Sequence, residues 1–285
     1  MARYYLAKLN IIENIFTEDM QRIKMELIPQ RVLSFKNDTL FYTVGHKIDG
    51  ESRAKWTFSD VEQMSSNIIS GNIAKQEEVT RFEIREGKSV KSVANDAKLV
   101  KFFYLIGEEL LLIQSNSGIN YADSIIIFRQ LLLLNDDLHL IGDIKINVLS
   151  NQSKAIEELI SKPVRKITLK YHVPNDPKTL NTISDILLDA HAQKGKFEIQ
   201  NPDGLKATEH GKLSRVFSNI ISITKKGYGE WSAKVGSKKH PKTLSSEEYP
   251  ITKNVSDDSL KDGVSVTKVV KEMKDRVEET SGDDK

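Results

Sequence analysis

The sequence LVKFFYLIGEELLLI, residues 99–113, decides the fold of the N-terminal part of the chain. Two apolar runs, 99–106 and 110–113, flank a turn at Gly107-Glu108. Apolar runs of this length that are bounded by turn residues are typical of strands buried on both faces. We therefore expect a β-hairpin in the middle of a sheet.

Segments on either side of this hairpin extend the expected sheet. Residues 3–12 and 39–44 are rich in apolar and aromatic side chains, and residues 80–84 alternate apolar with charged side chains. Asp49-Gly50 is a strong turn signal. After the hairpin, Asn120 is suited to cap a helix that runs to about residue 134 and is apolar on almost every side. These patterns predict an antiparallel sheet with a buried helix.

The region after residue 135 predicts mixed helices and strands. We expect strands at 138–149 and 164–171 around a helix at 153–160, together a β-α-β unit. A helix then begins at Asp176-Pro177 and ends at Gly195, and a strand follows at 196–200. The next expected element is a helix that buries one apolar stripe, formed by Leu213, Val216, Phe217 and Ile220. A basic exposed hairpin with Tyr228 and Trp231 follows. The last expected element is a terminal amphipathic helix with the apolar residues Val266, Val269, Val270, Met273 and Val277.

The predicted fold class is therefore α+β, with an N-terminal antiparallel sheet and buried helix, a mixed α/β C-terminal region and a terminal amphipathic helix. The expected domains are a β-rich domain at 1–135, an α+β domain with the basic hairpin at 136–255, and the amphipathic helix with an acidic disordered tail at 256–285.

Composition excludes several classes of function. The chain has 285 residues, no cysteine and a formal charge of +2, so disulfides, Cys-ligated metals and thiol nucleophiles are absent. No charged-then-apolar signal segment begins the sequence, and the most apolar stretch, 125–134, is about half the length that a bilayer requires. We expect a cytoplasmic protein. Scattered glycines and isolated histidines predict no cofactor, no bound metal and no small-molecule substrate.

One pattern is compatible with an enzyme. In Gly142-Asp143-Ile144-Lys145, a lysine follows a carboxylate by two residues on an expected strand, as in magnesium-dependent nucleases, and Asp123 or Asp136 would supply a second carboxylate. An alternating strand also places Asp143 and Lys145 on one solvent face without any catalytic role. A nuclease is therefore an alternative hypothesis, and no catalytic residue is assigned.

Charge placement gives the leading hypothesis. Residues 205–254 contain ten basic and four acidic residues, whereas residues 255–285 contain nine acidic and six basic ones. Such a basic segment fits binding of a polyanion through its phosphates, which is salt-dependent and largely independent of sequence. It is equally compatible with lysines that only keep a hairpin soluble. The expected nucleic-acid-binding residues are Lys212, Arg215, Lys225, Lys226, Lys234, Lys238, Lys239 and Lys242.

The terminal helix supports a third hypothesis. Its apolar stripe must be covered, either by the helix's own domain or by a second copy of the chain. A regulator that binds another protein through this helix is therefore a second alternative.

Three passages resemble the RexA-type phage-exclusion proteins: residues 40–50 with 56–58, residues 143–171, and residues 249–255. Residues 227–231 and 240–242 also resemble an uncharacterised family of bacterial and prophage genomes. The resemblance implies a non-catalytic, dimeric protein that binds double-stranded DNA and acts in abortive infection or superinfection exclusion. A relationship to KwaB-like defence subunits implies in addition a membrane-associated effector partner. The resemblance assigns no contact residue.

Overall fold

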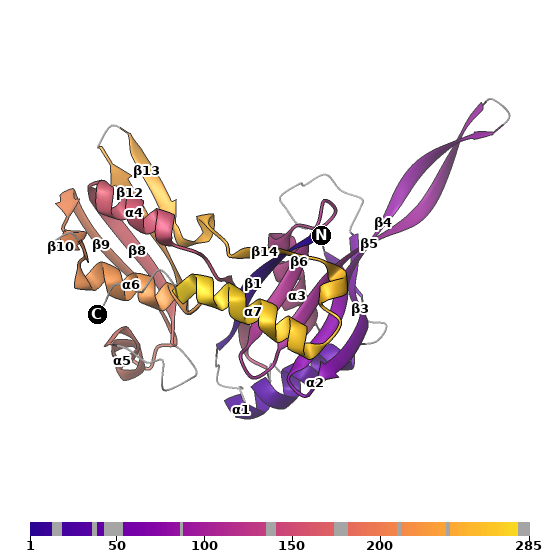
Figure 1. Cartoon of the computed structure of the whole chain (residues 1–285), viewed down its shortest axis with the longest axis horizontal. Helices are drawn as coiled ribbons and strands as arrows, with labels where there is room; N and C mark the ends of the chain where they lie inside the picture. The colour runs from indigo at the N-terminus through magenta and orange to yellow at the C-terminus, as the bar shows by residue number, and fades with distance from the viewer. Residues whose placement is uncertain are drawn as a thin grey trace.

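The computed structural model is an α+β protein, as the sequence predicted, and it has two main sheets with their helices and a short two-stranded sheet, β10-β11 (Figure 1). The residues that it describes are 1–12, 19–35, 39–42, 54–85, 88–134, 141–173, 182–209, 212–237 and 240–278. The expected turn at Asp49-Gly50 and helix start at Asp176-Pro177 lie outside these residues, as does the acidic tail from 279.

The larger sheet is antiparallel, with the strand order β14-β1-β6-β5-β4-β3-β2 and with β7 also paired to β1. The predicted hairpin at 99–113 is confirmed, because its two runs lie in neighbouring strands β5 and β6 with Phe103 opposite Leu112. The expected strand at 80–84 lies within β4. The strand bounds are β1 Ala2–Ile12, β2 Leu40–Tyr42, β3 Ala54–Ser65, β4 Ile68–Arg85, β5 Lys88–Leu105, β6 Leu110–Ser115, β7 Asp143–Val148 and β14 Thr252–Val255.

Strand β1 organises this sheet because segments from three parts of the chain pair with it. One edge of β1 pairs with β6, and the other edge is shared by β14, which pairs with residues 2–5, and β7, which pairs with residues 7–12. Tyr4 and Leu6 are buried on one face of the sheet, and Leu9 and Ile11 are buried on the other. Both faces of β1 are therefore core.

Helices cover both faces of the larger sheet. Helix α3 (Tyr121–Leu133) begins after Asn120, whose side chain caps it as predicted, and packs on one face with α1 (Met20–Arg22), η1 (Ile23–Leu27) and α2 (Ile28–Leu33). Helix α7 (Gly263–Glu278) crosses the other face, where its residues Val266, Val270 and Met273 are buried. The predicted amphipathic helix thus docks on its own chain. No helix in the described ranges has the length and apolarity needed to cross a bilayer.

The smaller sheet has the order β13-β12-β8-β9, and all of its strand pairs are antiparallel. Its core contains Trp231, Leu169 and Tyr171, which pack against helices on one face only. The elements are α4 Ser153–Ser161, β8 Val164–His172, α5 Thr182–Asp189, β9 Lys194–Leu205, β10 Thr208–Glu209, β11 Lys212–Leu213, α6 Arg215–Lys225, β12 Gly229–Gly236 and β13 Pro241–Ser245, and two short 3-10 turns follow at Ser246–Glu248 and Asp257–Ser259.

Three features differ from the sequence-based expectations. Strands β7 and β8 belong to different sheets, so they do not form the expected β-α-β unit. The basic hairpin is not simply exposed, because alternate residues of β12 and β13 form the core of the smaller sheet. Val216 is 47% exposed rather than buried, because the buried stripe of helix α6 runs along Phe217, Ile220, Ile221 and Thr224 and Val216 lies at its edge. The chain also returns from the smaller sheet to complete the larger one with β14 and α7 (Figure 1).

Candidate nucleic-acid interface

The face of the smaller sheet that points away from α4, α5 and α6 is polar and basic. Along β8, Ile167 and Leu169 are buried against the helices, so the alternate residues face the other way. Strand register then fixes which side chains lie together. Lys170 lies between Lys196 of β9 and Glu230 of β12.

Two rows of lysines cross this face. One row contains Lys170 and Lys196, and the other contains Lys166 and Lys234, which are paired across β8 and β12. Lys194 extends the face beside His172, and Lys145 of β7 reaches it from the larger sheet. We call this surface the basic sheet face; it comprises Lys145, Lys166, Lys170, Lys194, Lys196 and Lys234.

Two glutamates lie among these six lysines and each of them bridges two. Glu198 contacts Lys166 at 2.7 Å and Lys196 at 3.4 Å, and the hydrogen bond from Lys166 lowers the pKa of Glu198. Glu230 contacts Lys145 at 3.0 Å and Lys170 at 3.5 Å. Neither Lys194 nor Lys234 has an ion-pair partner within the described ranges, so the face keeps a positive excess.

Glu230 stays ionised although it is half-buried. Burial opposes its ionisation, but hydrogen bonds from Glu247 and Lys145 and the charges of Lys145 and Lys170 outweigh this effect and lower the pKa of Glu230. Glu247 shows the opposite shift, because its hydrogen bond to Glu230 and its own burial raise the pKa of Glu247. When this carboxyl pair takes up a proton, Glu247 therefore binds it before Glu230 does.

His172 closes the end of the basic sheet face nearest the larger sheet. It is 9% exposed, and its Nδ1 has no hydrogen-bond partner among the residues that the structure describes. Burial, followed by the charges of Lys145 and Lys194, lowers the pKa of His172 to about 4. At neutral pH this histidine is uncharged and adds no cation to the surface.

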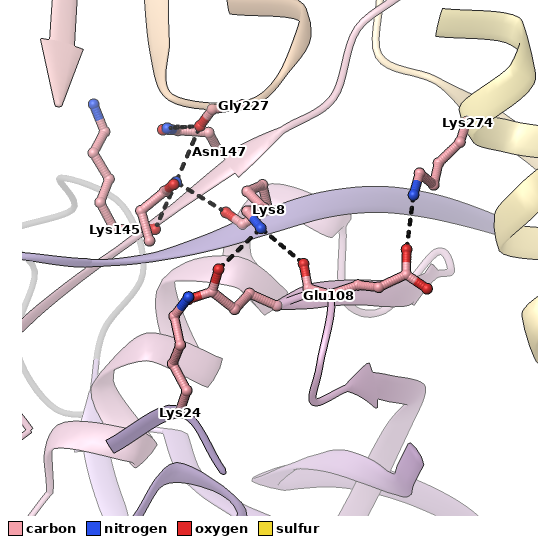
Figure 2. A network of polar contacts seen from close by, with 9 residues as sticks. Lys8, Lys24, Glu108, Lys145, Asn147, Gly227 and Lys274 are labelled. Carbon is pink, nitrogen blue, oxygen red and sulfur yellow. Dashed lines mark hydrogen bonds and ion pairs between the residues drawn. The ribbon is translucent and has the colours of Figure 1, made fainter. Parts of the chain in front are cut away.

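A polar network holds the smaller sheet against the larger one (Figure 2). The carbonyl oxygen of Gly227 accepts hydrogen bonds from the amides of Asn10, at 3.0 Å, and Asn147, at 2.7 Å. Gly227 has a φ of +82°, and a Cβ at this position would lie 2.6 Å from Cβ of Lys8. Only glycine fits this turn, which directly precedes strand β12.

The same network includes a buried carboxylate. Glu109 lies in the turn between β5 and β6 and contacts Lys8 at 3.0 Å and Lys24 at 3.1 Å. Lys8 also donates to the carbonyl oxygen of Glu108, whose carboxylate contacts Lys274 of α7 at 2.7 Å (Figure 2). These contacts connect β1, η1 and α7, and so stabilise the framework on which the basic sheet face is mounted.

The structure does not bring the eight sequence-predicted binding residues into one surface. Lys234 lies on the basic sheet face. Lys242 lies on the other side, next to buried Leu244, and contacts Glu158 of α4 at 2.8 Å. The hydrogen bond to Glu158 raises the pKa of Lys242.

Four of the remaining predicted residues lie in or next to α6, which covers the opposite face of the smaller sheet. Arg215 begins this helix and Lys226 caps its end, and both are exposed. Lys225 is half-buried, which lowers the pKa of its amine. Lys212 lies in β11 before the helix, so it does not share a helical stripe with Arg215. Lys238 and Lys239 lie outside the described residues.

The sequence contained a signal for the lysines that were missed. In residues 166–172, K-I-T-L-K-Y-H, polar and apolar side chains alternate, and residues 194–198, K-G-K-F-E, alternate in the same way. This period places the lysines of each strand on one face. The net charge of the segment 205–254 hid the signal, because these strands precede that segment.

The residues of the nuclease pattern have structural partners. Asp143 contacts Arg129 at 2.6 Å, and Lys145 contacts Glu230. Asp123 accepts a hydrogen bond at 2.8 Å from Asn120 at the start of α3. Asp136 lies outside the described residues. In the parts of the chain that the structure describes, no three His, Asp or Glu side chains are grouped closely enough to hold a metal ion.

The fold and this surface define an α+β protein with two main sheets, the smaller of which has one helix-covered and one basic face. The chain belongs to the family described as a domain of unknown function, DUF4747, whose model matches residues 18–274. This match includes every strand of both sheets except β1. A search of curated proteins finds no match.

Proposed function

We propose that this protein is a non-catalytic binder of double-stranded DNA that contacts the phosphate backbone through the basic sheet face. The observation that supports the proposal is the placement of six lysines with two glutamates on one open sheet face. Lysine ammonium groups act as point charges that suit phosphates. Among the described residues, the side chains between them on β8 and β12 are the small hydroxyl groups of Thr168 and Ser232.

The spacing of the two lysine rows fits a duplex. Lys166 and Lys170 are four residues apart on one strand, which corresponds to about 13 Å. The major groove of B-DNA is about 12 Å wide, so the two rows can contact the phosphates that border one groove. Contacts of this kind position a duplex without reading its bases. The proposed binding is therefore largely independent of sequence.

The resemblance to phage-exclusion proteins supports the biological setting of the proposal. In that setting the protein is cytoplasmic, acts in abortive infection or superinfection exclusion, and transmits its response to a membrane-associated effector partner. Binding to phage DNA would then be the input to this response.

The test compares two pairs of charge reversals on opposite faces of the smaller sheet. Lys170→Glu with Lys196→Glu alters the basic sheet face, and the matched control, Arg215→Glu with Lys226→Glu, alters α6. Fluorescence anisotropy measures binding to duplex DNA, single-stranded DNA and RNA at several salt concentrations. We expect the first pair to weaken duplex binding about tenfold and to reduce the log–log salt slope by about 0.9 for each phosphate that the variant no longer neutralises. The control pair should change affinity less than about twofold.

Two outcomes would contradict the proposal. Equal duplex affinity of the wild type and the sheet-face variant would show that the basic sheet face does not bind the duplex. Loss of binding in the α6 variant alone would assign binding to α6. A gel of the same duplex with added Mg²⁺ tests the nuclease alternative. Cleavage that Asp143→Ala abolishes would support that alternative and contradict a non-catalytic role.

A further inference from the structure

Strands β4 and β5 extend beyond the larger sheet as a two-stranded ribbon (Figure 1). They pair continuously from Ile68↔Leu105 to Arg85↔Lys88. The neighbouring strand β3 stops pairing with β4 at Gln76, and β6 pairs with β5 only from residue 102 onward. We call residues 77–85 and 88–96 the outer ribbon. It is about 30 Å long, at 3.4 Å per residue.

Both edges of the outer ribbon lack a paired strand among the described residues. Natural sheets protect such edges with bulges, prolines or charged side chains. The outer ribbon has charged side chains but neither a bulge nor a proline, because the β4–β5 register runs without a shift and residues 77–96 contain no proline. By contrast, the β3–β4 pairing inside the sheet shifts register twice. The outer ribbon is twisted and presents two edges that neither a bulge nor a proline interrupts (Figure 1).

The composition of the outer ribbon favours a protein partner over a polyanion. Residues 77–96 contain five acidic and four basic residues, so there is no positive excess. On one face, Phe82, Ile84 and Val93 are 69%, 80% and 65% exposed. An isolated two-stranded ribbon is marginally stable in water, whereas three or more strands with an apolar face are stable. Additional strands would therefore stabilise it.

We propose that the outer ribbon pairs with the outer ribbon of a second copy of this chain, β5 against β5, in an antiparallel arrangement centred on Ser92. A two-fold axis through this residue places Lys88 of one copy opposite Asp96 of the other, and it does so twice. It also places Ser89 opposite Asn95, and Lys91 opposite Val93. Opposite charges and aliphatic contacts at directly opposed positions stabilise antiparallel strands. The product is a four-stranded sheet that joins two protomers.

The arrangement can be distinguished from contacts within one chain. Lys88 and Asp96 lie eight residues apart on the same strand, at about 27 Å, and cannot contact each other within a protomer. Any energetic coupling between these two residues must therefore come from a second copy. A disulfide can also test the two-fold axis, because only the residue on the axis lies opposite the same residue of the second copy.

The absence of cysteine from the chain gives a direct test. Ser92→Cys places two thiols opposite each other across the proposed axis, at a Cβ separation that a disulfide can span. We expect the full-length variant to form a disulfide-linked dimer on mild oxidation. The matched control is Ser89→Cys on the same strand, whose thiol would face Asn95 of the second copy. It should remain uncrosslinked under the same conditions.

Charge reversal provides the second measurement, with sedimentation equilibrium of the full chain as the assay. Asp96→Lys and Lys88→Asp should each raise the dimer dissociation constant about tenfold, and the double variant should restore it. A wild-type chain that is monomeric at all concentrations would overturn the proposal. Equal crosslinking of Ser89→Cys and Ser92→Cys would overturn the register. A monomer whose duplex binding falls in these variants would instead assign the outer ribbon to nucleic acid.

Discussion

Substitution of Gly227 by alanine tests how the two sheets are held together. The residue has a φ of +82°, and the added Cβ would meet Cβ of Lys8 at 2.6 Å and Cδ2 of Leu149 at 3.0 Å. A left-handed backbone costs a non-glycine residue about 1–2 kcal/mol. Inserting a methyl group into a packed site costs about 1–3 kcal/mol. Together they predict a loss of about 2–5 kcal/mol, centred on about 3 kcal/mol, in the free energy of unfolding.

Thermal unfolding followed by circular dichroism measures this loss. For a chain of this size, about 3 kcal/mol lowers the Tm by roughly 6–12 °C. The matched control is Gly204→Ala, because Gly204 also has a positive φ, +117°, but the nearest atom to its added Cβ is 3.9 Å away. This control carries the backbone cost alone, about 1–2 kcal/mol. If Gly227→Ala destabilises the protein no more than Gly204→Ala, the close packing against Lys8 does not hold the sheets together.

Three further predictions concern the core and the site. Glu109→Ala leaves the partly buried amines of Lys8 and Lys24 without their counter-charge, so urea denaturation should show a loss of about 3–5 kcal/mol; a loss below about 1 kcal/mol would contradict this. The folded-state pKa of His172, about 4, lies below its ordinary value of 6.5, so the neutral form stabilises the fold. The contribution of His172 to the free energy of unfolding is complete above pH 6.5 and falls by about 3 kcal/mol as the pH falls toward 4. Denaturation measured over this pH range should show the loss, and His172→Asn should remove it. Met273→Ala on α7, at a fully buried position, should lower the free energy of unfolding measured in urea by about 2–5 kcal/mol. The control Val264→Ala, at an 81% exposed position of the same helix, should change it by less than about 0.5 kcal/mol. Equal effects would show that the apolar stripe of α7 does not pack on the larger sheet.

Local signals in the sequence predicted most elements correctly. The apolar runs at 99–113, the cap at Asn120 and the amphipathic pattern of α7 each depend on neighbouring residues, and the structure confirms all three. The pairing of strands that are far apart in the sequence could not be predicted in the same way. Residues 143–148 have the alternation of a strand, but nothing local shows that their partner is β1 rather than the next strand along the chain.

The candidate site shows the same limit. Net charge over a window of sequence identified lysines that α6 and β13 place on the opposite side of the smaller sheet from Lys234. The basic sheet face became visible only when strand register brought Lys166, Lys170 and Lys196 together. Charge along a chain and charge on a surface differ whenever strands alternate their side chains between two faces. Only residues 80–84 of the outer ribbon have the alternation that predicts a strand, whereas residues 88–96 show no regular alternation of apolar and polar side chains.

The sharing of one edge of β1 between β7 and β14 has a consequence for synthesis on the ribosome. The first strand of the protein cannot complete its pairing until residues 252–255 have emerged, and the apolar surface around Tyr4 and Leu6 stays uncovered until α7 follows. A nascent chain therefore displays this surface until the residues of β14 and α7 have been synthesised.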